Sequence, residues 1–165
     1  MQKITLKEAT LYTAIITVCI LLDQLTKWLA VKLLMPIDTF PIIENALHLT
    51  YHENRGMAFG MLADRRWIFM SISTVLIVGL LLYLYLGFAK SSTLSAVAVA
   101  MITAGGIGNM IDRVLLGYVV DFIDFRLINF AIFNGADSFV CVGAGLLVLA
   151  LILESIKEAR GGQVK

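Results

Sequence analysis

Two aspartates, Asp121 and Asp137, lie in strongly apolar sequence and are the first candidates for chemistry. A carboxylate with such neighbours must be paired, protonated or functional, because burying an isolated charge is costly. If the stretch between them (122–136) folds back, the two groups can share one proton. The ionised carboxylate would then draw a proton from water while the protonated one polarises a carbonyl, which is chemistry suited to peptide hydrolysis.

Two further polar groups interrupt apolar stretches. Asp23 and Lys27 are four residues apart, so they share a helix face and can neutralise each other. They are either an ion pair that fixes the fold or part of a polar site. Asn109, Asp112 and Arg113 end a helix face of small residues, and they either anchor the helix at a membrane boundary or position something charged.

The residues around Asp137 also have a structural interpretation. Asn134 and Asp137 suit the start of a helix, where side-chain oxygens accept from free backbone N–H groups. The histidines offer no competing chemistry, because we expect His48 and His52 to be exposed on an extramembrane strand. We see no glycine-rich phosphate loop or metal cluster, and we expect neither a cofactor nor a metal.

The charge distribution predicts the elements that position these residues. Only 15% of the 165 residues are charged, against roughly 25% in a soluble domain. Charges are absent from 67–89 and from 91–111, and 127–153 contains only Asp137. Since about 20 apolar residues span a bilayer, we expect an all-α membrane domain over 1–165. The predicted spans cover approximately residues 10–33, 67–88, 94–116 and 137–156.

A predicted loop (34–66) joins the first two spans. Its residues 46–52 alternate apolar and polar side chains, which predicts a strand in a small antiparallel sheet. An even number of spans places both termini on one side. Six Lys and Arg residues lie on the terminal side and seven on the other, but four of those seven lie within or against the membrane. Cytoplasmic termini are therefore favoured, and the net charge of +1 predicts no nucleic-acid partner.

Over essentially its whole length, the sequence resembles the bacterial lipoprotein signal peptidases (signal peptidase II). Five motifs carry the resemblance, in matching order along four spans of matching size. They are Asp23-Gln-Leu-Thr-Lys27, Asn54-Arg-Gly-Met-Ala-Phe-Gly60, Gly108-Asn-Met-Ile-Asp-Arg113, Val119-Val-Asp-Phe122 and Phe133-Asn-Gly-Ala-Asp-Ser138.

The resemblance implies a membrane aspartic endopeptidase that cuts prolipoproteins before the diacylglyceryl-modified cysteine. Asp121 and Asp137 would be its catalytic pair, whereas Asp124 matches no motif aspartate. The enzyme would be a four-helix bundle with an extracytoplasmic sheet in the bacterial cytoplasmic membrane. It would act as a monomer among membrane lipids, with its active site toward the extracytoplasmic side. The implied supporting or substrate-binding residues are Asp23, Lys27, Asn54, Gly56, Asn109, Asp112, Arg113, Asn134 and Ala136.

Two other functions stay open on the residues alone. The intramembrane acids and bases could form the proton relay of a small transporter or channel. Transporters, however, have repeated halves with broken helices near the midplane, and no repeat is visible here. A purely structural membrane subunit would leave the cluster of acids unexplained.

Overall fold

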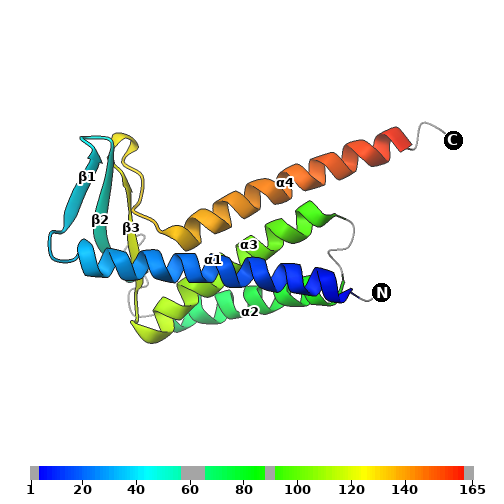
Figure 1. Cartoon of the computed structure of the whole chain (residues 1–165), viewed down its shortest axis with the longest axis horizontal. Helices are drawn as coiled ribbons and strands as arrows, with labels where there is room; N and C mark the ends of the chain where they lie inside the picture. The colour runs from blue at the N-terminus through cyan, green and yellow to red at the C-terminus, as the bar shows by residue number, and fades with distance from the viewer. Residues whose placement is uncertain (1–3, 57–65, 88–91, 162–165) are drawn as a thin grey trace.

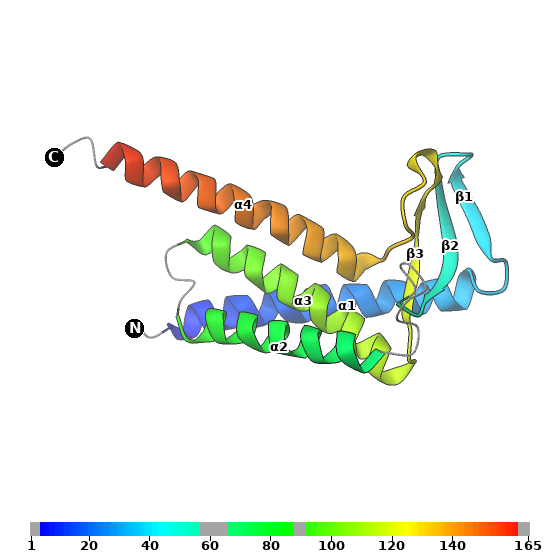
Figure 2. The ribbon, with the colours of Figure 1, turned by 180° about the vertical axis from the view of Figure 1, so that it is seen from behind.

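The computed structural model describes residues 4–56, 66–87 and 92–161. Four helices run lengthwise, a small sheet lies across one end of them, and both termini lie toward the other end (Figures 1 and 2). The helices are α1 (Leu6–Leu33), α2 (Arg66–Tyr85), α3 (Thr93–Leu115) and α4 (Gly135–Gly161). The helical part of the predicted fold is thus confirmed, with helix ends within five residues of the predicted spans.

Three of these helices, α1, α3 and α4, are long and apolar enough to cross a membrane. The apolar part of α2 is shorter, at Met70–Tyr85. Large apolar side chains are exposed along the outer helix faces, among them Leu21, Val75 and Leu151. Such a surface suits hydrocarbon and not water.

The sheet has three antiparallel strands in the order β1 (Thr39–Ile43), β2 (Leu47–Asn54) and β3 (Val119–Phe125). The predicted strand over 46–52 is confirmed as part of β2. The sequence reasoning did not anticipate β3, which follows α3 and returns to pair with β2. The β2–β3 register is irregular between Leu49 and His52, so that His52 lies opposite Asp121. Pairing with β2 therefore holds Asp121 at the junction of sheet and helices.

The prediction that His48 is exposed is wrong. The residue is buried, with only 9% of its surface accessible. It lies opposite Asp124 on β3, and its Nδ1 lies 3.3 Å from Thr39 Oγ1. Asp124 accepts from Arg126 Nε at 2.8 Å and from Thr50 Oγ1 at 2.9 Å. Burial alone would raise the pKa of Asp124, but these hydrogen bonds lower it below its usual value. This polar cluster holds the sheet together and explains why His48 is covered.

Helices α3 and α4 pack closely because glycines lie between them. A Cβ on Gly105 of α3 would overlap the carbonyl oxygen of Ala136 and lie 2.7 Å from Val140 Cγ2. On α4, a Cβ on Gly143 would lie 2.8 Å from the Ala98 carbonyl oxygen. Small residues of this kind let helix backbones approach within a membrane.

Gly105→Ala should therefore destabilise the fold by about 1–3 kcal/mol, because the added methyl group meets backbone that cannot move aside easily. Thermal unfolding in detergent micelles would measure the loss. Gly145→Ala on α4 is the matched control, since its Cβ would meet no atom within 4 Å. An equal loss of stability in both variants would contradict this account of the packing.

Candidate active site

The segment between the two candidate aspartates folds back, as predicted. Phe133 accepts from the backbone N–H groups of Phe122 and Ile123 at 3.0 and 2.8 Å, and its own N–H donates to the Ile123 carbonyl at 3.1 Å. These bonds bring the start of α4 beside β3. Asp121 and Asp137, on different elements, therefore reach the same end of the bundle.

Asn134 contacts both aspartates. Its Nδ2 donates to Asp121 Oδ1 at 2.6 Å. Its Oδ1 accepts from the Asp137 backbone N–H at 3.0 Å, while Asp137 Oδ2 accepts from the Asn134 N–H at 3.3 Å. This reciprocal pair caps α4, so the helix-cap interpretation of the sequence is correct, yet the same fully buried amide also reaches Asp121.

Asp121 accepts a second amide hydrogen bond, from Asn54 Nδ2 to its Oδ2 at 2.8 Å. Asn54 is held in turn, because its Oδ1 accepts from the N–H of Gly56 at 2.9 Å. Gly56 has φ 82°, a conformation in which a side chain is strained. The remaining residues of that motif (57–60) lie outside the described part of the chain.

The environment of Asp121 makes this carboxyl easier to protonate than an ordinary aspartate. Only 1% of its surface is exposed. Burial raises the pKa of Asp121 to about 6, and the charge of Asp137 adds to this, while hydrogen bonds from Asn54 and Asn134 oppose it. The structure therefore places an easily protonated carboxyl near a second carboxylate, and pairs of this kind occur at catalytic sites.

Asp137 takes its remaining hydrogen bond from α3, where Asn109 Nδ2 donates to Asp137 Oδ1 at 2.7 Å. The other side of the Asn109 amide accepts from Lys27 Nζ at 2.9 Å and from Asn134 Nδ2 at 3.1 Å. A continuous chain of amides thus links the two aspartates to the interior of the bundle.

The predicted Asp23–Lys27 pair is present and has a third member. Lys27 Nζ lies 3.0 Å from Asp23 Oδ2 and 3.0 Å from Asp112 Oδ2, and all three residues are buried. Asp23 Oδ1 also accepts from the Ala136 N–H at 2.7 Å, which ties α1 to the start of α4. Asp112 Oδ2 accepts from the Val120 N–H at 3.1 Å, which ties α3 to β3.

Two residues beside these ion pairs, Gln24 and Gly108, have structural roles that the sequence analysis did not predict. Gln24, which the sequence analysis did not single out, donates from Nε2 to Asp23 Oδ2 at 3.2 Å and to Asp112 Oδ1 at 3.1 Å. A Cβ on Gly108 would lie 2.5 Å from Asp23 Oδ2, so only glycine leaves room there. No periodicity signals either role, because both depend on how α1 and α3 meet.

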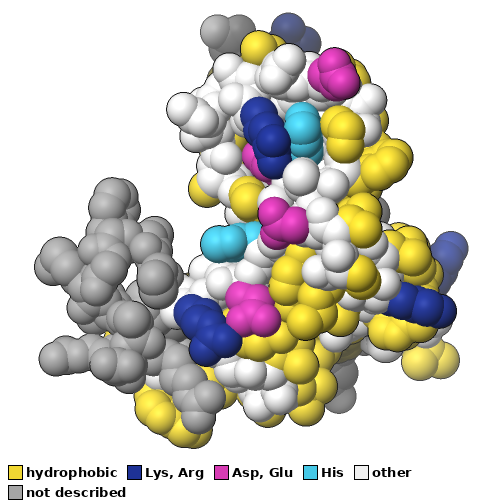
Figure 3. Space-filling view, turned by 90° about the vertical axis from the view of Figure 1, so that its left-hand side faces the viewer, with side chains coloured by type: hydrophobic (Ala, Val, Ile, Leu, Met, Phe, Trp, Pro, Cys, Tyr) yellow, Lys and Arg dark blue, Asp and Glu magenta, His cyan; other side chains and the backbone are white. Residues whose placement is uncertain are grey.

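Arg113 is the predicted site residue that the structure leaves at the edge of the network. It is partly exposed, and its Nη1 lies 3.4 Å from the Asn109 carbonyl oxygen on its own helix. Acidic, basic and histidine side chains gather on this end of the molecule beside hydrophobic ones (Figure 3). Among the described residues, no group of three or more His, Cys, Asp or Glu side chains is arranged to hold a metal.

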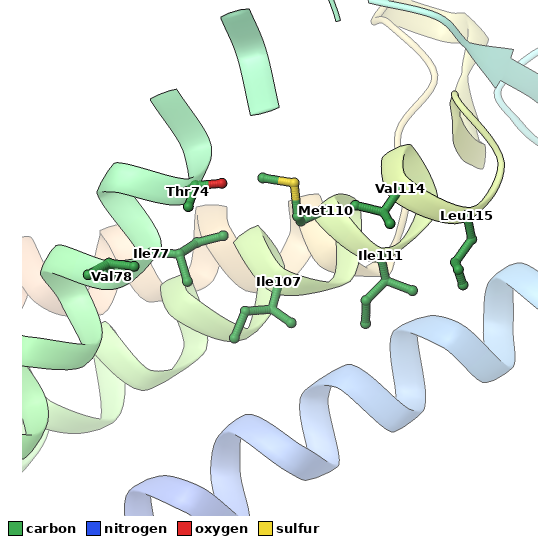
Figure 4. Close-up of a pocket in the computed structure, with 8 residues that line it drawn as sticks. All are labelled: Thr74, Ile77, Val78, Ile107, Met110, Ile111, Val114 and Leu115. Carbon is green, nitrogen blue, oxygen red and sulfur yellow. The ribbon is translucent and has the colours of Figure 1, made fainter. Parts of the chain in front are cut away.

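An apolar pocket of about 350 Å³ lies away from the aspartates, between α2 and α3 (Figure 4). None of its lining residues is ionisable, so it has no group that could activate water. Hydrocarbon chains suit such a lining better than water does. The lining residues are Thr74, Ile77, Val78, Ile107, Met110, Ile111, Val114 and Leu115.

Comparison with known proteins identifies the family of this chain. The family model of signal peptidase (SPase) II matches residues 15–153. A lipoprotein signal peptidase of Caldanaerobacter subterraneus is 49% identical over 85% of this chain and 94% of its own length. That of Bacillus subtilis is 41% identical over 91% of this chain and 98% of its own length.

A solved structure described as a bacterial membrane enzyme superposes with a TM-score of 0.80. It is 32% identical to this chain, and the match covers 94% of both. Neither this structure nor the relatives named above support the transporter or channel interpretation, since the relatives are peptidases. Matching the family model over most of its length, the chain belongs to the signal peptidase II family.

Proposed function

We propose that Asp121 and Asp137 are the catalytic pair of a lipoprotein signal peptidase. The observation that carries this assignment is Asn134, which lies just before α4 and hydrogen-bonds to the Asp121 carboxyl and to the Asp137 backbone N–H. The Asp121 carboxyl accepts from the Asn134 side chain, and the Asp137 carboxyl accepts from the Asn134 backbone N–H. Two carboxyl groups held beside one residue suit the sharing of a single proton.

The roles of the two groups follow from their surroundings. Asp121, whose pKa is raised to about 6, holds the shared proton and donates it to the scissile carbonyl oxygen. Asp137, ionised, takes a proton from water as the hydroxide forms a bond to the carbonyl carbon. The tetrahedral intermediate then breaks at its C–N bond: the departing amine takes up the proton from Asp137, and the ionised Asp121 takes back a proton from one hydroxyl group of the intermediate. The pair thus returns to its singly protonated form.

The substrate fits the position of this pair. A prolipoprotein presents an apolar signal helix that ends at a cysteine bearing diacylglycerol, so its scissile bond lies at the membrane surface. Asp121 lies on β3 and Asp137 in the first turn of α4, near where the sheet lies across one end of the helices (Figures 1 and 2). In the proposed topology this end of the helices lies at the membrane surface. Arg113, partly exposed beside the network, is available to the substrate peptide.

The same proposal gives the topology. The 165 residues form one domain that crosses the bacterial cytoplasmic membrane four times, with α2 as the fourth span. Both termini lie in the cytoplasm, and the sheet and aspartates lie on the extracytoplasmic side. The enzyme works as a monomer in contact with membrane lipid, without nucleic acid, cofactor or metal.

The test is cleavage of a purified prolipoprotein by the detergent-solubilised protein. A substrate with a diacylglyceryl-modified cysteine should release its signal peptide, and the same substrate without the lipid should not. Mass spectrometry of both products would locate the cut. Cleavage at another bond, or equal cleavage of both substrates, would contradict the proposed specificity.

A further inference from the structure

We infer that Lys27 is a positioning residue for the catalytic pair, because its ammonium group fixes which way the Asn109 amide faces. The inference rests on the proposed function, since it concerns how Asp137 is held for catalysis. Lys27 contacts neither aspartate of the pair in the structure. It acts through Asn109, which receives its hydrogen bond and passes one to Asp137.

The hydrogen-bonding capacity of Lys27 is fully used. An ammonium group has three N–H donors and no acceptor. Its nitrogen lies near three acceptor oxygens, those of Asp23 and Asp112 at 3.0 Å each and that of Asn109 at 2.9 Å. Because Lys27 can only donate, the Asn109 atom that faces it must be the oxygen.

The other partners of Asn109 agree with this orientation. Asn134 Nδ2 also donates to the Asn109 oxygen, at 3.1 Å, so the Asn109 NH₂ group is left to face Asp137 at 2.7 Å. If the Asn109 amide were reversed, its NH₂ group would face the donors of Lys27 and Asn134, and its oxygen would face the Asp137 carboxylate. All three contacts would then be unfavourable.

Lys27 contributes more to this choice than Asn134 does. Both donate to the Asn109 oxygen, but a hydrogen bond from a charged donor is roughly twice as strong as a neutral one. Lys27 is also nearly inaccessible, with 3% of its surface exposed, so water screens its charge little. Without Lys27, one neutral hydrogen bond to the Asn109 oxygen would remain, beside the bond that the Asn109 NH₂ group donates to Asp137.

A purely structural role is the competing explanation, because Lys27 also neutralises two buried carboxylates. The combined variant Asp23→Asn, Lys27→Met, Asp112→Asn separates the two roles. It removes all three charges together, and each new asparagine retains an oxygen to accept from Ala136 or Val120. The cluster formed by positions 23, 27 and 112 then contains no unpaired charge, while Asn109 has lost its ammonium partner.

The experiment compares wild type, Lys27→Met and the combined variant in thermal unfolding and in cleavage of lipidated prolipoprotein across pH. We expect the combined variant to fold, with kcat per folded molecule reduced on the order of 10- to 100-fold and KM changed much less. Its pH–rate profile should also differ from that of the wild type, because the contacts that hold the catalytic pair have changed, whereas a purely structural role would leave the profile unchanged. Lys32→Met is the matched control, because it removes a lysine from the same helix at a different place. The Lys32 Nζ lies over the Trp28 ring, 5.0 Å from its centroid.

A combined variant with the wild-type kcat and pH profile would overturn the inference. So would a loss of rate that only follows the folded fraction, since Lys27 would then be structural. Asp121→Asn is assayed beside these variants. If Asp121→Asn still cleaves, the proposed catalytic pair fails; if it is inactive while the Lys27 variants are normal, only the positioning role fails.

Discussion

Asp121→Asn and Asp137→Asn are each expected to lower the cleavage rate by about 10³- to 10⁴-fold or more. An asparagine retains the shape of the side chain but can neither take a proton from water nor return one to the leaving group. Release of signal peptide from lipidated prolipoprotein, measured per folded molecule, tests both variants. Circular dichroism and thermal unfolding show whether they fold.

Asp124→Asn is the control for this prediction, because Asp124 lies on the same strand but bonds to Arg126 and Thr50 in the sheet. We expect it to keep most of its activity while losing some thermal stability. If Asp121→Asn or Asp137→Asn cleaved as fast as Asp124→Asn, the assignment of the catalytic pair would be wrong.

The pH dependence of cleavage should be bell-shaped, with its basic limb set by Asp121. Below the acid limb both carboxyls are protonated and no base remains for water. As the pH rises through the Asp121 pKa of about 6, the free enzyme loses the shared proton and with it the general acid. The ratio kcat/KM should therefore fall about tenfold per pH unit above that point.

The profile of kcat alone should extend to higher pH than that of kcat/KM. A bound signal helix and lipid displace water, which makes a second negative charge costlier and keeps the proton on the pair. Both profiles can be measured on detergent-solubilised enzyme across pH 4 to 9. A kcat/KM that stayed level over this range would contradict a shared proton, and Asp124→Asn should reproduce the wild-type curve.

Apolar length and charge spacing were enough to predict the helices, because in a bilayer each backbone group must bond within its own segment. They were not enough for the sheet. The alternating segment in β2 could be read directly, but β3 contains Asp121 and Asp124 among apolar residues, and its strand character depends on pairing with β2. His48 was predicted to be exposed for a similar reason, since its burial depends on its place between β1 and β3, where it pairs with Pro41 and Asp124.

The site shows the same division. Residue types at the right spacing identified both aspartates, the Asp23–Lys27 pair and Asn134. What each one touches depends on tertiary contacts: Lys27 reaches Asp112 and Asn109 from a different helix. For Asn134 the sequence suggested a helix cap, and its side-chain amide caps α4 through its oxygen while its nitrogen donates to Asp121.

The hydrogen-bonded network also sets when during synthesis the chain can first act. Its members come from α1, β2, α3, β3 and the first turn of α4, so no partial set holds both aspartates. Because a ribosome adds roughly 5–20 residues per second, several seconds pass between Asp23 and Asp137 leaving the peptidyl-transferase centre. A nascent chain that has inserted only its earlier helices has no Asp137, so under the proposed catalytic assignment proteolytic competence arises only when α4 joins the bundle.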